Sequence, residues 1–344
     1  MPLTPSTRRA LTAAAAAAAL AMAAGCGDDG EDTGGPDSEP VSVTYLTGFG
    51  CSAHDSFMFV AEEKGYFDEA GLDVTLEPAG GQQNYHTLLA DEAQFTYVDF
   101  TGMLLDVGRG EFDAGEFVAL NSVHQSTLVA ILAPESSGIE SPQDLEGKRI
   151  GAFANSPTEL LLPAYAELTG WEFDPDLVVQ ASIQELFGLL PSGQADALSS
   201  FIIQKGVIAG AAGEPLVEFP FNQVLDDLLG TGIITTASFA EENPEAAEAF
   251  RDAAIEGLRY TIQNPEEAIE ILQNCDPGVA ETAEAYVAQI QIMEPYITSE
   301  GDDRVGVMDE AHVLRCIGVL ESAGLIPSGM QPNAIIGDLT LLTS

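Results

Sequence analysis

From Val41 onward the chain alternates short apolar runs with segments of helical character, and this alternation constrains the fold more than any other feature. Alternating strands and helices are typical of an α/β protein with mostly parallel sheets. The roughly 300 residues after Val41 exceed the usual size of one core, so we expect two lobes. We expect strands at 41–46, 74–77, 95–98, 118–120, 128–133, 149–153, 177–180, 195–199, 216–220 and 232–236.

Four helix starts have a common pattern, in which a capping residue precedes a proline at the first helical position and an acidic residue follows in the first turn. They are Ser141-Pro142, Ser156-Pro157, Asn243-Pro244 and Asn264-Pro265. Apolar residues at helical spacing predict that the stretch from Asn243 to Cys316 is wholly helical.

The first forty residues have the features of an export signal followed by a tether. Arg8 and Arg9 precede an uncharged apolar run that is too short to span a bilayer. The small residues before Cys26 resemble a bacterial lipoprotein cleavage site, which implies that Cys26 becomes the lipidated first residue; the alternative is an ordinary signal peptide with an incidental cysteine. We therefore expect a signal peptide at 1–25, a flexible tether at 26–40, and an exported protein lipid-anchored to the outer face of the cytoplasmic membrane.

Acidic residues dominate the charge of the chain. There are 55 Asp and Glu against 11 Lys and Arg, which gives a formal net charge of −44. Nucleic acid and anionic membrane surfaces are poor partners for such a surface. Because 46% of the residues are hydrophobic, the chain still supports sizeable cores, and we expect the acidity to lie on the surface.

Three cysteines follow Cys26, and an oxidising exterior permits one disulfide among them. Cys275 and Cys316 both lie in the C-terminal third of the chain. We expect these two to pair and Cys51 to be free.

Three sequence blocks carry a resemblance to a known family. Residues 54–67 (HDSFMFVAEEKGYF) are followed by AGLDV at 70–74; the second block is IESPQDLEGKRIG at 139–151, and the third is LLPSGQADA at 189–197. In this order and spacing they resemble the periplasmic substrate-binding proteins of ABC importers for sulfonates, taurine, nitrate and thiamine-pyrimidine precursors. The resemblance covers about Val41 to Gln273.

The resemblance implies a two-lobed type II periplasmic binding protein fold of the α/β class, with a hinge and an interlobe ligand cleft. Lobe one would comprise residues 41–125 and 233–344, and lobe two residues 126–232. It also implies a monomer that binds a small molecule outside the cytoplasm, needs no cofactor and delivers its ligand to an ABC transporter permease.

Open α/β sheets bind ligands beyond the carboxyl ends of their strands, so the loops after the predicted strands are the places to look for a site. The candidate ligand-binding residues there are Phe49, Ser52, His54, Gln82, Gln83, Asn84, Tyr97, Asp99, Phe100, Asn155, Ser156, Phe201 and Lys205. Their types offer aromatic faces, amides and hydroxyls. The alternative for each is a structural role in a turn, a helix cap or the core.

One of these alternatives has a specific form. Ser156 and Glu159 have the spacing of a capping box, which would occupy the Ser156 hydroxyl and leave Asn155 as the better ligand-binding candidate.

The scarcity of basic residues bears on the charge of the ligand. Only Lys205, and less plausibly Arg109, is expected near the cleft, whereas several aromatic residues lie at or near strand ends. This favours an aromatic heterocycle, such as a thiamine-pyrimidine precursor, over a sulfonate, taurine or nitrate.

An enzyme related to the thiamine-pyrimidine synthases is the alternative class. Those enzymes carry a cysteine-rich segment that this chain lacks, and the chain has no G-x-S-x-G, H-E-x-x-H or phosphate-loop motif. Its four histidines have no metal-ligand spacing in the sequence. We therefore expect neither catalytic residues nor a metal.

Overall fold

The computed structural model describes residues 39–80, 83–298, 301, 304–308 and 310–335. The expected lipidation site at Cys26, the signal peptide and Gln82 lie outside these described residues. Residues from Glu39 onward form one compact unit. No helix within the described ranges is long and apolar enough to cross a membrane.

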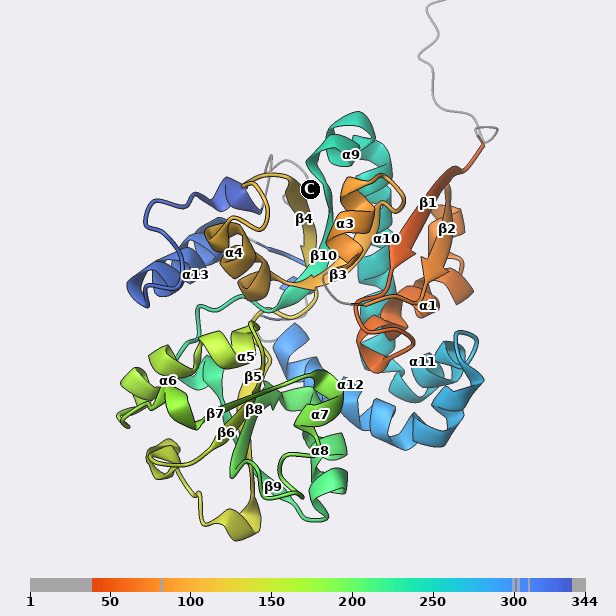
Figure 1. Ribbon diagram of the computed structural model, residues 1–344. Helices are drawn as coiled ribbons and strands as arrows, with labels where there is room; N and C mark the ends of the chain where they lie inside the picture. The colour runs from red at the N-terminus through yellow and green to blue at the C-terminus, as the bar shows by residue number, and fades with distance from the viewer. Residues whose placement is uncertain (1–38, 81–82, 299–300, 302–303, 309, 336–344) are drawn as a thin grey trace, which may run out of the picture. The chain divides into compact units, whose positions relative to one another are not determined.

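The described part of the chain contains ten strands in two five-stranded sheets, and all ten lie where the apolar runs predict them (Figure 1). The first sheet has the order β2-β1-β3-β10-β4 and contains β1 (Val41–Leu46), β2 (Leu72–Glu77), β3 (Phe95–Asp99), β4 (Phe117–Ser122) and β10 (Thr231–Thr236). The second has the order β7-β6-β8-β5-β9 and contains β5 (Val129–Pro134), β6 (Ile150–Phe153), β7 (Val178–Ala181), β8 (Ala197–Phe201) and β9 (Leu216–Pro220).

The sheets are mostly parallel, as expected, but each contains one strand that runs against the other four. Strand β10 is antiparallel to both β3 and β4, and β5 is antiparallel to both β8 and β9. The other pairs, β1 with β2 and β3 and β6 with β7 and β8, are parallel. The chain crosses from the first sheet to the second between β4 and β5, and it returns between β9 and β10. The strand that follows each crossing, β5 or β10, is the antiparallel one.

Two hydrophobic cores cover opposite faces of the strands. In β5, Ala130 and Leu132 belong to one core, while Val129 and Ile131 belong to the other, because successive side chains of a strand point to opposite faces. Since both faces are buried, the strand appears in the sequence as a continuous apolar run rather than an alternating one.

Helices surround both sheets (Figure 1). They are α1 (Ser56–Glu63), α2 (Tyr66–Glu69), α3 (Gln83–Leu89), α4 (Phe100–Arg109), α5 (Pro157–Leu160), α6 (Leu162–Thr169), α7 (Ile183–Leu186), α8 (Lys205–Ala212), α9 (Ala237–Glu242), α10 (Pro244–Gln263), α11 (Pro265–Leu272), α12 (Ala283–Ile297) and α13 (Glu310–Ser322). The stretch after Asn243 is not wholly helical, because residues 273–276 separate α11 from the 3-10 helix η7 (Pro277–Thr282).

Helices do begin at Pro157, Pro244 and Pro265, and a 3-10 helix, η3 (Pro142–Leu145), begins at Pro142. The capping residues act differently from one another. Ser141 and Asp144 form a capping box, whereas the side chains of Asn243 and Asn264 do not cap the helices that follow them. Each Asn amide donates instead to a carbonyl four residues earlier, so these side chains close the preceding helices α9 and α10.

The disulfide joins Cys51 to Cys275, with Cα atoms 5.8 Å apart, so the expected pairing of Cys275 with Cys316 was wrong. Helix α11 packs against α1, which brings Cys275 beside the loop that precedes α1. Cys316 lies instead in the core beneath α4, where burial raises the pKa of its thiol to about 12.

Candidate functional site

Two adjoining cavities lie between the sheets, at the carboxyl ends of β1, β3, β6 and β8. The inner chamber has a volume of about 200 Å³ and is lined by Gly48, Phe49, His54, Asn84, Tyr85, Tyr97, Val98, Asp99, Gly102, Asp106, Leu128, Phe153, Ser156, Phe201 and Thr231. The outer chamber has a volume of about 580 Å³ and is lined by Gly48, Phe49, Ser52, His54, Ala79, Gly80, Phe153, Thr158, Leu186, Phe187, Ser200, Phe201, Gln204, Val207, Tyr286 and Gln289.

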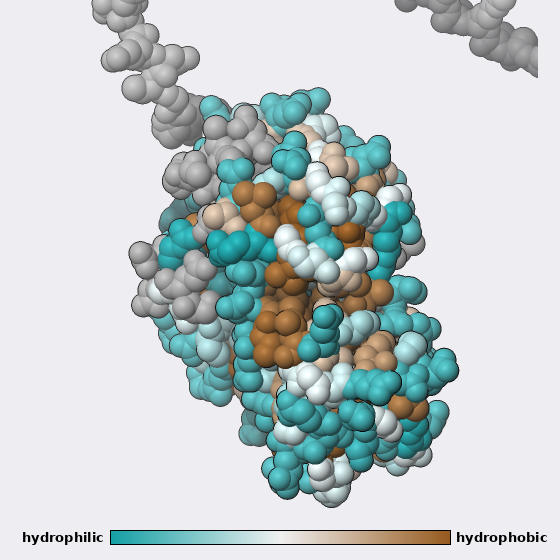
Figure 2. Space-filling model, turned by 90° about the vertical axis from the view of Figure 1, so that its left-hand side faces the viewer, coloured by the Kyte–Doolittle hydropathy of each residue, from teal (hydrophilic) through white to brown (hydrophobic). Residues whose placement is uncertain are grey.

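One face of the molecule is mostly hydrophilic around a hydrophobic centre (Figure 2). In the face shown in Figure 2, hydrophobic residues gather near the middle, and hydrophilic residues cover most of the rest. Among the described acidic residues, Asp55 and Asp106 are the buried ones, so the acidity lies largely on the surface, while aromatic side chains line the chambers between the sheets.

A buried carboxyl group, that of Asp55, holds the loop between β1 and α1. Its Oδ1 accepts hydrogen bonds from the Tyr45 hydroxyl at 2.6 Å and the Gly48 N–H at 3.0 Å, and its Oδ2 accepts from the Phe49 N–H at 3.3 Å. Burial raises the pKa of Asp55 to about 6, against the lowering effect of these bonds. The loop is also held by the disulfide at Cys51 and by a bridge from Phe49 to Gly80.

The Phe49 side chain projects from this fixed loop. It is 45% exposed, and its ring centroid lies 4.7 Å from that of His54. A Cβ atom at Gly48 would lie 2.8 Å from the Tyr97 ring, so only glycine allows the loop to approach β3 this closely. Phe49 is therefore a largely pre-positioned aromatic wall between the two chambers.

Behind this wall, Tyr97 hydrogen-bonds with two buried partners. Its hydroxyl lies 2.5 Å from Thr231 Oγ1 and 3.2 Å from His124 Nδ1, and these two atoms lie 2.6 Å apart. Burial lowers the pKa of His124 to about 3, so its imidazole is neutral. Because the hydroxyl of Tyr97 is occupied, its ring is the part available to a ligand in the inner chamber.

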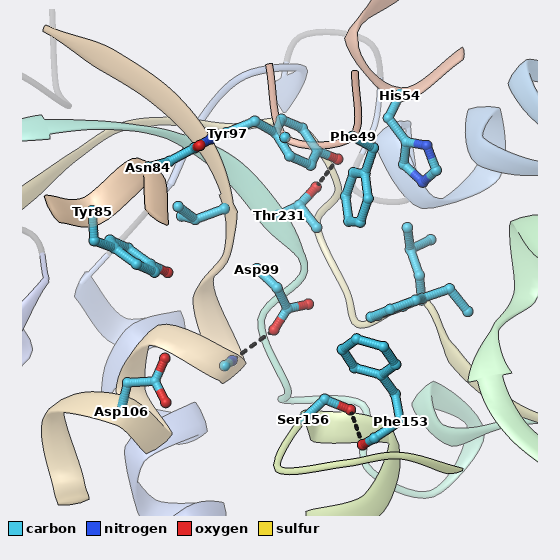
Figure 3. Close-up of a pocket in the computed structure, with 15 residues that line it drawn as sticks. Phe49, His54, Asn84, Tyr85, Tyr97, Asp99, Asp106, Phe153, Ser156 and Thr231 are labelled. Atoms are coloured by element: carbon cyan, nitrogen blue, oxygen red, sulfur yellow. Dashed lines mark hydrogen bonds between the residues drawn. The ribbon is translucent and has the colours of Figure 1, made fainter. Parts of the chain in front are cut away.

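Two carboxyl groups, those of Asp99 and Asp106, line the inner chamber. Asp99 ends β3 and caps α4, with its Oδ1 accepting from the Gly102 N–H at 2.6 Å. Its Oδ2 is buried and has no hydrogen-bond partner among the described residues. Asp106 lies two helical turns further along α4, on the same face. Figure 3 shows the Asp99 carboxylate in the middle of the chamber, below Tyr97 and Phe49 and above Ser156 and Phe153.

Burial raises the pKa of Asp99 to about 7 against the lowering effect of the Gly102 N–H, and the charge of Asp106 makes a smaller contribution in the same direction as burial. Asp106 forms an ion pair with Arg109 Nη1 at 3.6 Å. Lys and Arg are absent from the described residues that line the inner chamber. The chamber is therefore acidic and aromatic.

The second sheet supplies Phe153, Ser156 and Phe201 to the opposite wall. The Ser156 hydroxyl donates to the Phe153 carbonyl at 2.7 Å and accepts from the Thr158 N–H at 3.2 Å. The expected capping box is not formed, because Glu159 Oε2 accepts from the Asn155 N–H at 2.7 Å. Asn155 has a φ of 58°, which turns the chain before the helix.

The outer chamber is lined by neutral groups. Helix α12 contributes Tyr286 and Gln289, and the loop after β1 contributes Ser52 and His54. Ser52 Oγ and His54 Nδ1 are buried without hydrogen-bond partners among the described residues. Burial lowers the pKa of His54 to about 4, so its imidazole is neutral.

Eight of the candidate residues line these chambers: Phe49, Ser52, His54, Asn84, Tyr97, Asp99, Ser156 and Phe201. The Asn84 amide donates to the Thr47 carbonyl and to Thr96 Oγ1, so part of its role is structural. Gln83 begins α3, but its side chain lies outside what the structure describes, as does Gln82.

Three candidates lie elsewhere. Phe100 is fully buried in the core, where a Cβ atom on Gly232 would lie 2.5 Å from its ring. Asn155 is exposed, and its carbonyl accepts from Arg109 at 3.4 Å. Lys205 forms an ion pair with Glu218 at 2.7 Å and lines neither chamber.

Several lining residues were not among the candidates, notably Asp106, Tyr85, Thr231, Tyr286 and Gln289. The position of Asp106, two helical turns after Asp99, was a usable signal. For the two residues of α12 the sequence offers none, because only tertiary packing brings that helix to the site.

Comparisons with known proteins agree with this architecture. The chain is 26% identical over 247 residues to the formylaminopyrimidine-binding protein of Halalkalibacterium halodurans. The aligned region covers 70% of this chain and 72% of that protein. It is 22% identical over 244 residues to the 4-amino-5-hydroxymethyl-2-methylpyrimidine phosphate synthase of Legionella pneumophila, covering 68% and 74%.

A similar fold occurs in the periplasmic aliphatic sulphonate binding protein SsuA of Escherichia coli, with a TM-score of 0.66, 14% identity, and coverage of 87% of this chain and 92% of that one. The two sheets flanked by helices are thus those of the periplasmic binding protein fold. Residues 53–268 match the family described as NMT1/THI5 like. The chain therefore belongs to the NMT1/THI5-like family.

Proposed function

We propose that this protein is an extracytoplasmic solute-binding protein that captures an amino-substituted aromatic heterocycle, such as a thiamine-pyrimidine precursor, for an ABC importer. The observation that carries the proposal is the inner chamber. There, aromatic rings surround the buried Asp99 carboxyl group, whose Oδ2 has no partner among the described residues, and Lys and Arg are absent from the described lining.

The size of the inner chamber suits one substituted ring. A cavity of about 150 Å³ is enough to bind benzene, and this chamber measures about 200 Å³. A ring in it can pack against Phe49 and Tyr97, and a ring amino group can donate to Asp99 Oδ2. Both interactions use groups that the protein already holds in place.

The same chamber disfavours sulfonates and nitrate. An anion there would lie near Asp99 and Asp106, with a neutral His54 and with no Lys or Arg among the described lining residues to balance its charge. Lys205, the cation expected to serve such a ligand, is paired with Glu218 away from both chambers. Arg109 contacts Asp106 and the Asn155 carbonyl.

The relatives support a binding role more than a catalytic one. The relative named as a formylaminopyrimidine-binding protein is 26% identical, while the synthase is 22% identical. The signal peptide expected at residues 1–25 would suit capture outside the cytoplasm. In this proposal Cys26 carries the lipid, and the monomeric protein hands its ligand to a permease.

Isothermal titration against a panel tests the proposal. The panel contains 4-amino-5-hydroxymethyl-2-methylpyrimidine, riboflavin, taurine, an alkanesulfonate and nitrate. We expect the aminopyrimidine to bind and to be recovered unchanged by NMR, whereas taurine, the sulfonate and nitrate do not bind.

Two variants refine the same test. Phe49→Ala should weaken aminopyrimidine binding by about 1–3 kcal/mol, because it removes a ring contact, whereas Lys205→Ala should leave it unchanged. Sulfonate binding that is lost in Lys205→Ala would contradict the proposal. Conversion of the pyrimidine would show an enzyme instead.

A further inference from the structure

We infer that Arg109 is a latch between the two lobes, each of which is built around one sheet, and that it sets how fast a bound ligand leaves the site. The latch consists of the Arg109 guanidinium in the first lobe and the backbone carbonyl of Asn155 in the second. Neither residue is among the described residues that line the chambers, so the latch acts on the lobes and not on the ligand. The inference rests on the proposed function, because it concerns release of the ligand proposed there.

Helices α4 and α5 bring the two lobes into contact beside the inner chamber. Helix α4 follows β3 of the first sheet and α5 follows β6 of the second, and Figure 1 shows α4 above α5. Near the start of α4, a Cβ atom on Gly102 would lie 3.4 Å from Pro157 Cγ, so the helices pack closely there. At the last residue of α4, Arg109 Nη1 donates to the Asn155 carbonyl at 3.4 Å. Asp106 of the inner chamber lies between these two contacts along α4.

The conformation of Asn155 holds the acceptor in place. Its φ of 58° is in the left-handed region, which only one other non-glycine residue in the described part of the chain, Asp91, adopts. Such a conformation is unfavourable for a residue with a side chain and persists only where neighbouring groups enforce it. Here Glu159 Oε2 accepts from the Asn155 N–H at 2.7 Å, and the Gln180 amide donates to Glu159 Oε1. Bonds within the second lobe thus fix this turn, so the carbonyl that Arg109 contacts is pre-positioned.

The donor is positioned from within the first lobe. Arg109 lies one helical turn after Asp106, and its Nη1 is 3.6 Å from Asp106 Oδ1. This ion pair holds the guanidinium at the end of α4 that contacts Asn155. The same nitrogen therefore contacts both the acidic wall of the inner chamber and the second lobe.

The bond between the lobes contributes only while the lobes are together. It therefore favours the closed arrangement over an open one and changes no contact with the ligand. A ligand enclosed between the sheets leaves only after the lobes separate, so the latch slows dissociation. Association takes place before the lobes meet, so the latch leaves the association rate unchanged.

Surface plasmon resonance with 4-amino-5-hydroxymethyl-2-methylpyrimidine tests the latch. Arg109→Gln should raise the dissociation rate about 3- to 10-fold, the effect of one lost hydrogen bond, and leave the association rate unchanged. Arg259→Gln is the matched control, because it makes the same change of charge and breaks a similar ion pair in α10, with Glu256 at 2.9 Å one turn earlier. The Arg259 and Arg109 side chains are 38% and 30% exposed, and the control should change neither rate.

A double-mutant cycle tests whether the turn at Asn155 supplies the acceptor. Glu159→Ala removes the acceptor of the Asn155 N–H and should also raise the dissociation rate, because the carbonyl loses its fixed position. In the Arg109→Gln background the same change should have no further effect, since the bond that it weakens is already gone. Effects that multiply would show that the two substitutions act independently, and would overturn the latch.

Spin labels measure the arrangement of the lobes in the free protein. The labels are attached to p-acetylphenylalanine in place of Leu89 of α3 and Leu168 of α6, which lie in different lobes and are 45% and 56% exposed. In double electron–electron resonance, Arg109→Gln should change the distribution of label distances from that of the wild type, because the closed arrangement loses population. Arg259→Gln should leave the distribution unchanged.

The outcomes separate the latch from the proposed function. A dissociation rate in Arg109→Gln equal to that of the wild type, or a change confined to the association rate, would overturn the latch and leave the proposed function in place. If the pyrimidine does not bind the wild type, the proposed function fails, and the label distances in the free protein decide the latch by themselves. Identical distance distributions in Arg109→Gln and Arg259→Gln would then overturn it.

Discussion

Replacing Asp99 with Asn tests whether its carboxylate recognises the ligand. The change preserves the shape of the side chain and the cap on α4, because an Asn Oδ1 can still accept from the Gly102 N–H. What it removes is the charge. With a pKa of about 7, Asp99 in the free protein is ionised to about 1% at pH 5 and about 90% at pH 8.

The magnitude follows from these fractions. A ligand that donates an amino hydrogen to the ionised carboxyl group should bind nearly 100-fold more tightly at pH 8 than at pH 5, apart from any titration of its own. At pH 8 the Asn variant should bind about 10- to 150-fold more weakly than the wild type, the range for losing a hydrogen bond worth about 1.5–3 kcal/mol to a charged group.

The unfolding free energy should change with pH in the opposite sense. The pKa of Asp99 is raised on folding from its ordinary 3.8, so folding favours the protonated form. That stability is fully present below about pH 4 and is lost as the pH rises through about 7. The Asn variant lacks this dependence, so the difference between variant and wild type should grow in favour of the variant over this range.

Titration calorimetry at pH 5, 6, 7 and 8 with 4-amino-5-hydroxymethyl-2-methylpyrimidine measures the effect on binding. The ratio of wild-type to variant affinity at each pH removes the titration of the ligand, because that titration is common to both proteins. Urea unfolding of the free proteins at the same pH values gives the second readout. A ratio that stays constant from pH 5 to pH 8, or a variant that binds more tightly at pH 8, would refute the role assigned to Asp99.

Three further predictions concern the stability of the site. Asp55→Asn should lower the unfolding free energy by about 1–3 kcal/mol at pH 4, because both oxygens of the protonated carboxyl group can still accept from loop N–H groups, whereas the amide nitrogen of Asn cannot. It should also abolish a stability contribution that is present below about pH 4 and lost as the pH rises through about 6, and urea curves with the wild-type pH dependence would contradict this. The double substitution Cys51→Ser and Cys275→Ser should lower the free energy of unfolding in urea by about 2–5 kcal/mol. The wild type in reductant should lose the same amount, and an unchanged free energy of unfolding in the double variant would show that the disulfide does not form. Gly232→Ala, whose Cβ would lie 2.1 Å from a carbonyl oxygen of β4, should cost about 1–3 kcal/mol. Gly206→Ala in α8, whose Cβ would have no atom within 4 Å beyond the backbone of its own helix, should be neutral or stabilising, and equal melting temperatures for the two variants would contradict the packing.

The strands were predictable because their signal is local. Apolar runs bounded by glycine and proline mark a buried strand whichever way it runs, so β5 and β10 were found although their directions were not. Strand direction in these sheets depends on which strand the chain joins after crossing between them. That choice is made by long-range packing, which no short window of sequence contains.

The site was predictable where one loop directly follows one strand. The rule on strand ends identified Phe49, His54, Tyr97 and Asp99. It failed at Phe100, which is adjacent to Asp99: once Asp99 caps α4, the next side chain enters the core instead of the chamber.

Lys205 was misplaced for a similar local reason. A short 3-10 helix, η5 (Ile202–Gln204), follows β8 and leads the chain into α8. Lys205, the first residue of α8, forms its ion pair with Glu218 on the edge strand β9 and does not line the chambers. One turn of helix thus separates Phe201, which lines the site, from Lys205, which does not.

The disulfide also bears on how the site binds its ligand. The pairing of Cys51 with Cys275, across 224 residues, fixes the same loop that Asp55 holds from within, so Phe49 is positioned by a covalent bond and by buried hydrogen bonds. A wall that is already ordered loses little conformational entropy when a ring packs against it. The facing wall, with Phe153 and Phe201, belongs to the second sheet. The chain passes between the two sheets in the segment from β4 to β5 and in the segment from β9 to β10. Ligand-induced adjustment should therefore be concentrated in these two connections, while the loop after β1 stays fixed.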